Sequence, residues 1–93
     1  MAGESPRRVA QKKVGAYHET CLGELADHVG AAIDGYRAGD LDAFEIDQVV
    51  LRYSRAAKEL WKFCTLTDVE FAASLIDDGG PRDWWEQAAP RRR

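Results

Sequence analysis

Apolar side chains recur every three or four residues along most of the chain, and the first such stretch begins near Lys13. At about 100° per residue, this spacing gathers the apolar positions into one stripe on a helix. The stripe consists of Val14, Tyr17, Cys21, Leu25, Val29, Ala32 and Tyr36. Gly39 follows it and can adopt the left-handed conformation that ends helices. We therefore expect a first helix over residues 13–38.

The second stretch has the most regular spacing in the chain, with steps that alternate between four and three residues. Its members are Ile46, Val50, Tyr53, Ala57, Leu60 and Cys64. Asp42 lies three residues before Glu45, which is the arrangement of a capping box at a helix start. The pattern predicts a helix over residues 42–64, about 35 Å long at about 1.5 Å per residue.

A third, shorter helix is predicted over residues 67–78. Thr67 and Glu70 form a second candidate capping box, with Thr67 as the cap. Gly79, Gly80 and Pro81 end this helix, and a short amphipathic turn over residues 82–89 can follow. No segment alternates apolar and polar residues in the way that a half-buried strand does, so we expect no strands.

These elements predict an all-α fold. Two long helices joined by a short connector must run antiparallel as a helical hairpin, because a parallel pair needs a long return connection. The third helix packs across the hairpin, and a tail with two tryptophans follows. We expect a flexible basic arm at 1–12, a single helical domain at 13–78 and a tail at 79–93. A chain of 93 residues has a thin core, so dimerisation is expected to complete the bundle.

Charge is unevenly distributed along the chain. Residues 14–78 carry five basic and thirteen acidic side chains, whereas both ends are net positive. An acidic body repels phosphates, so nucleic-acid binding is expected only as an alternative that uses the basic ends. The residues of that alternative are Arg7, Arg8, Arg91, Arg92 and Arg93.

The chain shows no secretion or membrane signal. No apolar stretch of the signal-peptide type follows Arg7 and Arg8, and no apolar run approaches the length of a membrane span. The two cysteines, Cys21 and Cys64, form no CxxC motif. We expect a cytoplasmic protein.

Residues with chemical potential do not assemble into a recognised catalytic motif. His18 and Cys21 share an apolar helix stripe, where a thiolate is disfavoured. Cys21, Glu24 and His28 lie near one another on the first helix, but the Glu-x-x-His pair of bundle metal sites is absent. We expect no enzymatic activity, no metal and no cofactor, with His18 hydrogen-bonded in the interior and His28 at its rim.

Two apolar residues on the second helix fall outside its seam, the regularly spaced apolar positions from Ile46 to Cys64. Phe44 and Leu51 are seven residues apart and share a face, and Arg55, Lys58 and Lys62 continue the same line. One interpretation is that the third helix or the tryptophan tail covers Phe44 and Leu51. The other is a basic and apolar surface for an acidic amphipathic helix of a partner, and a crossed dimer contact is a third.

Trp84 and Trp85 are adjacent, so they cannot both enter the same pocket from a helix. We expect one to cover the core and the other to stay partly exposed, where Trp85 either closes the bundle or anchors a partner. The sequence thus predicts a small interaction module, such as an adaptor, inhibitor or regulatory subunit, that binds a protein. The alternative is a small transcriptional or nucleic-acid-associated regulator.

Overall fold

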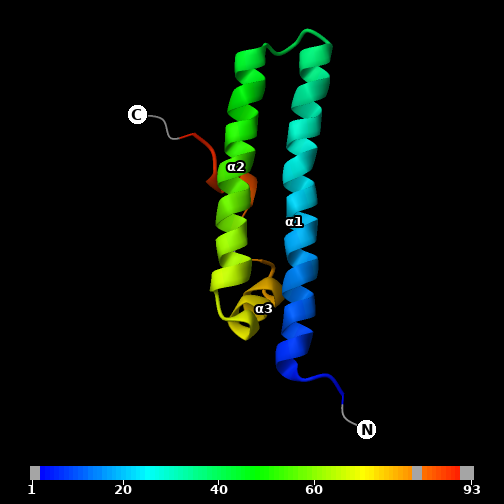
Figure 1. Cartoon of the computed structure of the whole chain (residues 1–93), viewed down its shortest axis with the longest axis vertical. Coiled ribbons are helices and arrows are strands. Elements are labelled where there is room, and N and C mark those ends of the chain that lie inside the picture. The colour runs from blue at the N-terminus through cyan, green and yellow to red at the C-terminus, as the bar shows by residue number, and fades with distance from the viewer. Residues whose placement is uncertain (1–2, 81–82, 91–93) are drawn as a thin grey trace.

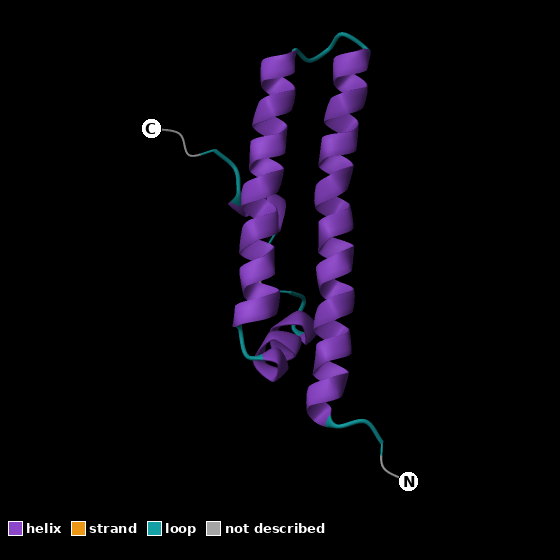
Figure 2. Ribbon diagram, in the orientation of Figure 1, coloured by secondary structure: helices purple, strands orange, loops and turns teal. Residues whose placement is uncertain are grey.

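The computed structural model describes residues 3–80 and 83–90. Within these residues the chain forms four helices and no strand (Figure 2). The helices are α1 (Pro6–Arg37), α2 (Ala43–Leu66), α3 (Val69–Asp77) and α4 (Trp84–Gln87). The expectation of an all-helical chain is confirmed.

Helices α1 and α2 lie side by side and run in opposite directions (Figure 1). Helix α3 folds back between the start of α1 and the end of α2, and the segment with α4 crosses behind α2 in this view. The molecule measures 60 × 31 × 19 Å. It is therefore long and flat, and much of the α1–α2 pair has no further layer over it.

Helix α1 begins at Pro6, seven residues before the predicted start at Lys13. The Ser5 hydroxyl accepts a hydrogen bond from the backbone N–H of Arg8 at 3.2 Å, and proline suits the first helical position. Glu4 pairs with Arg8 and Lys12 across the first turns. Because these signals are caps and charges, the apolar periodicity did not reveal them.

The ends of α1 and α2 at the connecting loop follow the predicted local rules. Gly39 has φ of 84°, and the N–H of Asp40 bonds to the carbonyl of Gly35 at 2.8 Å, which closes the last turn of α1. Asp42 caps α2 by accepting from the N–H of Glu45 at 2.8 Å, while the Glu45 carboxylate accepts from the N–H of Asp42 at 3.0 Å. The predicted capping box is confirmed.

The predicted cap of the third helix is wrong by one residue. Helix α2 continues to Leu66, so Thr67 becomes its C-terminal cap. Asp68 caps α3 instead, because its carboxylate accepts from the N–H of Phe71 at 3.1 Å.

The core consists of two clusters of buried side chains. One contains Cys21, Leu25, Ala56, Leu60 and Trp84, and the other contains Ala10, Val14, Ala72 and Ala73. Phe63 and Cys64 pack against both. Between Leu25 of α1 and the connecting loop, and between the loop and Ala56 of α2, Ala32 is the only buried side chain. In this region the contacts between α1 and α2 are made by partly exposed apolar side chains, so apolar surface remains in contact with water.

No helix among the described residues is both long enough and apolar enough to span a bilayer.

Candidate functional site

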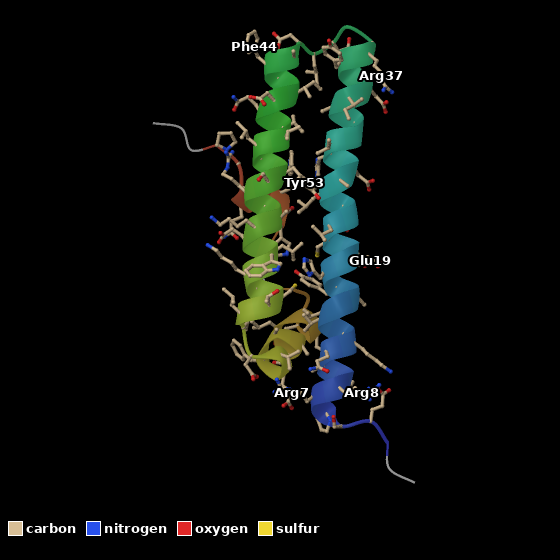
Figure 3. The ribbon with its side chains drawn as sticks, viewed as in Figure 1. Arg7, Arg8, Glu19, Arg37, Phe44 and Tyr53 are labelled. Carbon is tan, nitrogen blue, oxygen red and sulfur yellow. The ribbon has the colours of Figure 1, made fainter. Side chains whose placement is uncertain are left out.

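The outward face of α2, defined by Phe44, Leu51, Arg55, Lys58 and Lys62, lies on the side away from α1. Figure 3 shows Phe44 at the end of α2 beside the connecting loop. Its side chain is 82% exposed, and that of Leu51 is 44% exposed. The interpretation that α3 or the tail covers these two residues is wrong. Helix α3 packs chiefly on α1 near Ala10, at the far end of the molecule.

The basic side chains of this face are partly held in place. Arg55 donates a hydrogen bond from Nη2 to the carbonyl of Ala88 at 3.3 Å, and Lys62 Nζ lies 3.1 Å from the carboxylate of Glu59. A cavity of about 750 Å³ lies between α2 and residues 87–90, with Arg55 and Lys58 in its wall. The outward face of α2 therefore borders a groove whose second wall is formed by residues 87–90. These belong to the C-terminal segment, which we define as residues 83–90 and which contains α4.

Of the two roles that the sequence left open for Trp85, closing the bundle or anchoring a partner, its contacts match the first. Its indole stacks on the imidazole of His28, with ring centroids 4.1 Å apart and planes 3° apart. The guanidinium of Arg52 lies 4.2 Å from the Trp85 ring centroid, and Arg52 Nε donates to the Trp85 carbonyl at 3.0 Å. Trp85 thus fastens the C-terminal segment to α1 and α2. Sequence reasoning missed Arg52, because its partner lies 33 residues away and no local pattern links them.

Trp84 is the tryptophan that covers the core. It is 6% exposed, and its indole Nε1 donates a hydrogen bond to the hydroxyl of Tyr17 at 2.8 Å. Its ring also lies 5.7 Å from that of Phe63, measured between centroids. Adjacent residues on a helix point about 100° apart, so the two tryptophans enter different surroundings, and Trp84 is the buried one.

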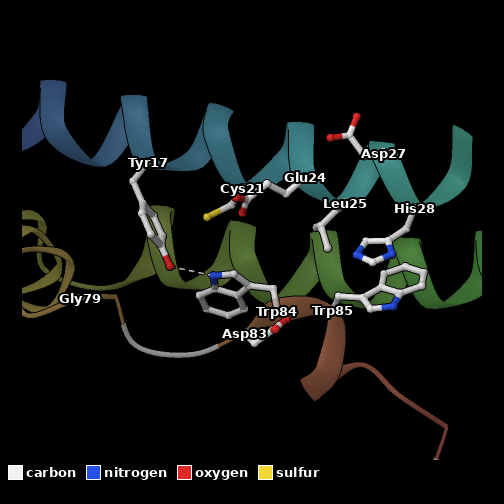
Figure 4. A pocket seen from close by; sticks show the side chains of 10 residues that line it. All are labelled: Tyr17, Cys21, Glu24, Leu25, Asp27, His28, Gly79, Asp83, Trp84 and Trp85. Atoms are coloured by element: carbon white, nitrogen blue, oxygen red, sulfur yellow. Dashed lines mark hydrogen bonds between the residues drawn. The ribbon is translucent and has the colours of Figure 1, made fainter. Parts of the chain in front are cut away.

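A second cavity, of about 660 Å³, lies between α1 and the C-terminal segment (Figure 4). Tyr17, Cys21, Glu24 and His28 of α1 face Trp84 and the rest of the segment across it. Burial raises the pKa of the Cys21 thiol above its usual value of 9.0 and raises that of Cys64 to about 11. Both thiols stay protonated near neutral pH, so they lack the thiolate that nucleophilic chemistry needs.

Tyr17 gives a pH prediction. Burial raises the pKa of its hydroxyl from 10.0 to about 12, and the hydrogen bond from Trp84 offsets part of that effect. Above pH 10 the unfolded chain loses the Tyr17 proton, whereas the folded chain keeps it. The free energy of unfolding is therefore expected to fall as pH rises from about 10 to 12. In an ultraviolet titration of tyrosinate, we expect one late-titrating tyrosine that disappears in Tyr17→Phe. Replacement of the exposed Tyr36 with phenylalanine should leave that late step in place.

The histidines and the basic ends differ in part from expectation. His18 is half-buried rather than interior. Over residues 3–80 and 83–90, no group of three or more His, Cys, Asp or Glu side chains is arranged to hold a metal ion.

Arg8 pairs with Glu4, and Arg7 is exposed on the first turn of α1. Arg91, Arg92 and Arg93 lie outside the described residues.

Comparison of the chain with protein-family models, curated proteins and solved structures finds no match. The geometry of its own residues is therefore the basis for a functional proposal.

Proposed function

We propose that this chain is a non-enzymatic interaction module that binds a protein partner through the outward face of α2. The role is that of a small adaptor, inhibitor or regulatory subunit. The observation that carries the proposal is Phe44, an aromatic side chain that is 82% exposed at a site where its own fold leaves it without cover. Aromatic side chains contribute strongly to binding when a partner removes them from water.

The chemistry of this face favours a particular kind of partner. Phe44 and Leu51 lie two helical turns apart, which matches the spacing of apolar residues on a helix that docks alongside. Arg55, Lys58 and Lys62 extend the same line with positive charge, although the middle of the chain is acidic overall. A complementary partner is an acidic amphipathic helix, whose apolar face meets Phe44 and Leu51 and whose carboxylates meet the basic residues.

The proposal includes a homodimer. Its support is the small number of buried side chains in the half of the α1–α2 pair beside the connecting loop. Association would remove the remaining apolar surface from water and so stabilise the fold.

Replacement of Leu51 with aspartate tests the partner surface. We expect Leu51→Asp to weaken binding of a synthetic amphipathic peptide, with leucines on one face and glutamates on the other, by at least about tenfold. The substitution places a buried charge at the contact and repels the glutamates of the peptide. Fluorescence anisotropy of the labelled peptide measures the affinity, and binding should also weaken as salt is raised.

Val50→Asp is the matched control for this experiment. Val50 is the neighbour of Leu51 and is equally exposed, at 44%, but it points about 100° away around the helix. It should leave peptide binding unchanged. If Leu51→Asp remains folded by circular dichroism and binds the peptide as tightly as the unmodified chain, the proposed partner surface is wrong.

A further inference from the structure

One side of the α1–α2 pair carries α4, and helical periodicity places a set of uncharged, mostly apolar side chains on the opposite side. On the α4 side, contacts with the C-terminal segment come from His28 of α1 and from Arg52 and Arg55 of α2. Helical periodicity at about 100° per residue then places the other edge of each helix on the opposite side. We name that side the flank face. Its members are Leu22, Ala26, Val29, Ile33 and Tyr36 of α1 and Ala43, Val50, Ser54, Ala57 and Trp61 of α2.

The flank face is open to solvent in the single chain. Tyr36 is 51% exposed, Trp61 is 49% exposed and Val50 is 44% exposed. Leu22 and Ala57 are half-buried and pack against the core from this side. The exposed residues of the flank face therefore have packed side chains beside them. Close packing of this kind is typical of the centre of a protein interface.

None of the ten side chains of the flank face is charged at neutral pH, and the charged residues nearest to it by helical periodicity, Glu19, Asp47 and Arg37, lie at its edges. Such a surface can meet a copy of itself without bringing like charges together. At the outward face of α2, by contrast, a symmetric contact would bring two sets of Arg55, Lys58 and Lys62 into one interface. This contrast favours a second copy of the chain as the occupant of the flank face.

The dimensions of the flank face also suit a dimer. On α2 this face runs from Ala43 to Trp61, which is about 27 Å of helix, and a pair of helices is about 20 Å wide. Their product is on the order of 500 Å². A standard protein interface takes about 800 Å² from each partner, so this face can supply most of the area of a standard interface.

We infer that two copies of this chain associate through their flank faces to form a four-helix bundle, with Trp61, Ile33 and Val50 in the new core. This inference rests on the homodimer in the proposed function and names its contact surface. Each chain keeps the outward face of α2 on the outside of the bundle. A dimer of this form presents two copies of the partner surface.

The adjacent pair Val50 and Leu51 tests the inference. At one fixed concentration, analytical ultracentrifugation should find the unmodified chain and Leu51→Asp at twice the chain mass of 10.4 kDa. Val50→Asp should be a monomer, with a dimer dissociation constant raised by about 100-fold or more, because a two-fold contact contains the substitution twice. Ile33→Asp tests the same face from α1 and should give the same shift.

A second measurement needs no variant. The melting temperature of the unmodified chain should rise with protein concentration, as it does when folding is coupled to association. A monomeric mass with a concentration-independent melting temperature would overturn the inference. So would a dimer that Leu51→Asp breaks and Val50→Asp leaves intact. Peptide binding that persists in monomeric Val50→Asp would separate the partner surface from the dimer surface.

Discussion

Replacing Trp84 with alanine is expected to lower the free energy of unfolding by about 3–5 kcal/mol. Trp84 is 6% exposed and lies over Cys21, Leu25 and Leu60 as part of the same cluster. Its loss removes a large buried ring and also the hydrogen bond to Tyr17. A domain of this size is expected to have about 5–15 kcal/mol of total stability. Chemical denaturation followed by circular dichroism measures the change.

Two related substitutions separate the causes of that effect. Trp84→Phe keeps a buried ring but removes the indole N–H, so the contribution of the hydrogen bond, about 0.5–1.5 kcal/mol, becomes visible. Trp85→Ala should cost less than Trp84→Ala, because Trp85 is only half-buried. A denaturation midpoint for Trp84→Ala that equals the unmodified midpoint would show that the C-terminal segment contributes nothing to the fold.

Replacing Leu60 with alanine is expected to cost about 2–5 kcal/mol, the range for a buried leucine whose removal leaves a cavity. Leu60 is 0% exposed and is the largest completely buried side chain in the described part of the chain. It packs in the same cluster as Cys21 of α1 and Trp84 of the C-terminal segment. The site has little freedom to collapse around the cavity, because its walls come from three different segments. Thermal and chemical unfolding together measure the loss.

Leu66→Ala is the control for Leu60→Ala. Leu66 is on the same helix, but its side chain is 69% exposed, so its truncation should change stability by less than about 0.5 kcal/mol. Equal losses for the two variants would mean that helix propensity, rather than burial at Leu60, governs the result.

Sequence reasoning predicted the long helices well where local interactions decide them. The capping box of Asp42 and Glu45 and the left-handed Gly39 involve residues within a few positions of each other, so they can be recognised without the fold. It failed at the start of α1, where the signals were Ser5 and Pro6 rather than apolar spacing. It also misplaced the cap of α3, because both Thr67 and Asp68 can cap a helix and their neighbours decide between them.

The candidate surface was recognisable only in part. The spacing of Phe44 and Leu51 showed that they share a face away from the seam, because seven residues make nearly two turns. Whether that face is covered depends on where α3 and the C-terminal segment pack, and periodicity carries no information about that. The sequence likewise left open whether Trp85 closes the bundle or anchors a partner, and only the fold shows its ring stacked on His28.

The amino-acid sequence by itself determined that this protein is helical and where α1 and α2 end at their connecting loop, because capping and periodicity act over a few residues. Tertiary structure alone decided that Trp84 is buried and Trp85 is clasped by Arg52 and His28. It also decided that α4 covers one side of the α1–α2 pair and leaves the flank face open. These outcomes depend on contacts between residues far apart in the chain, which form only when the whole molecule packs.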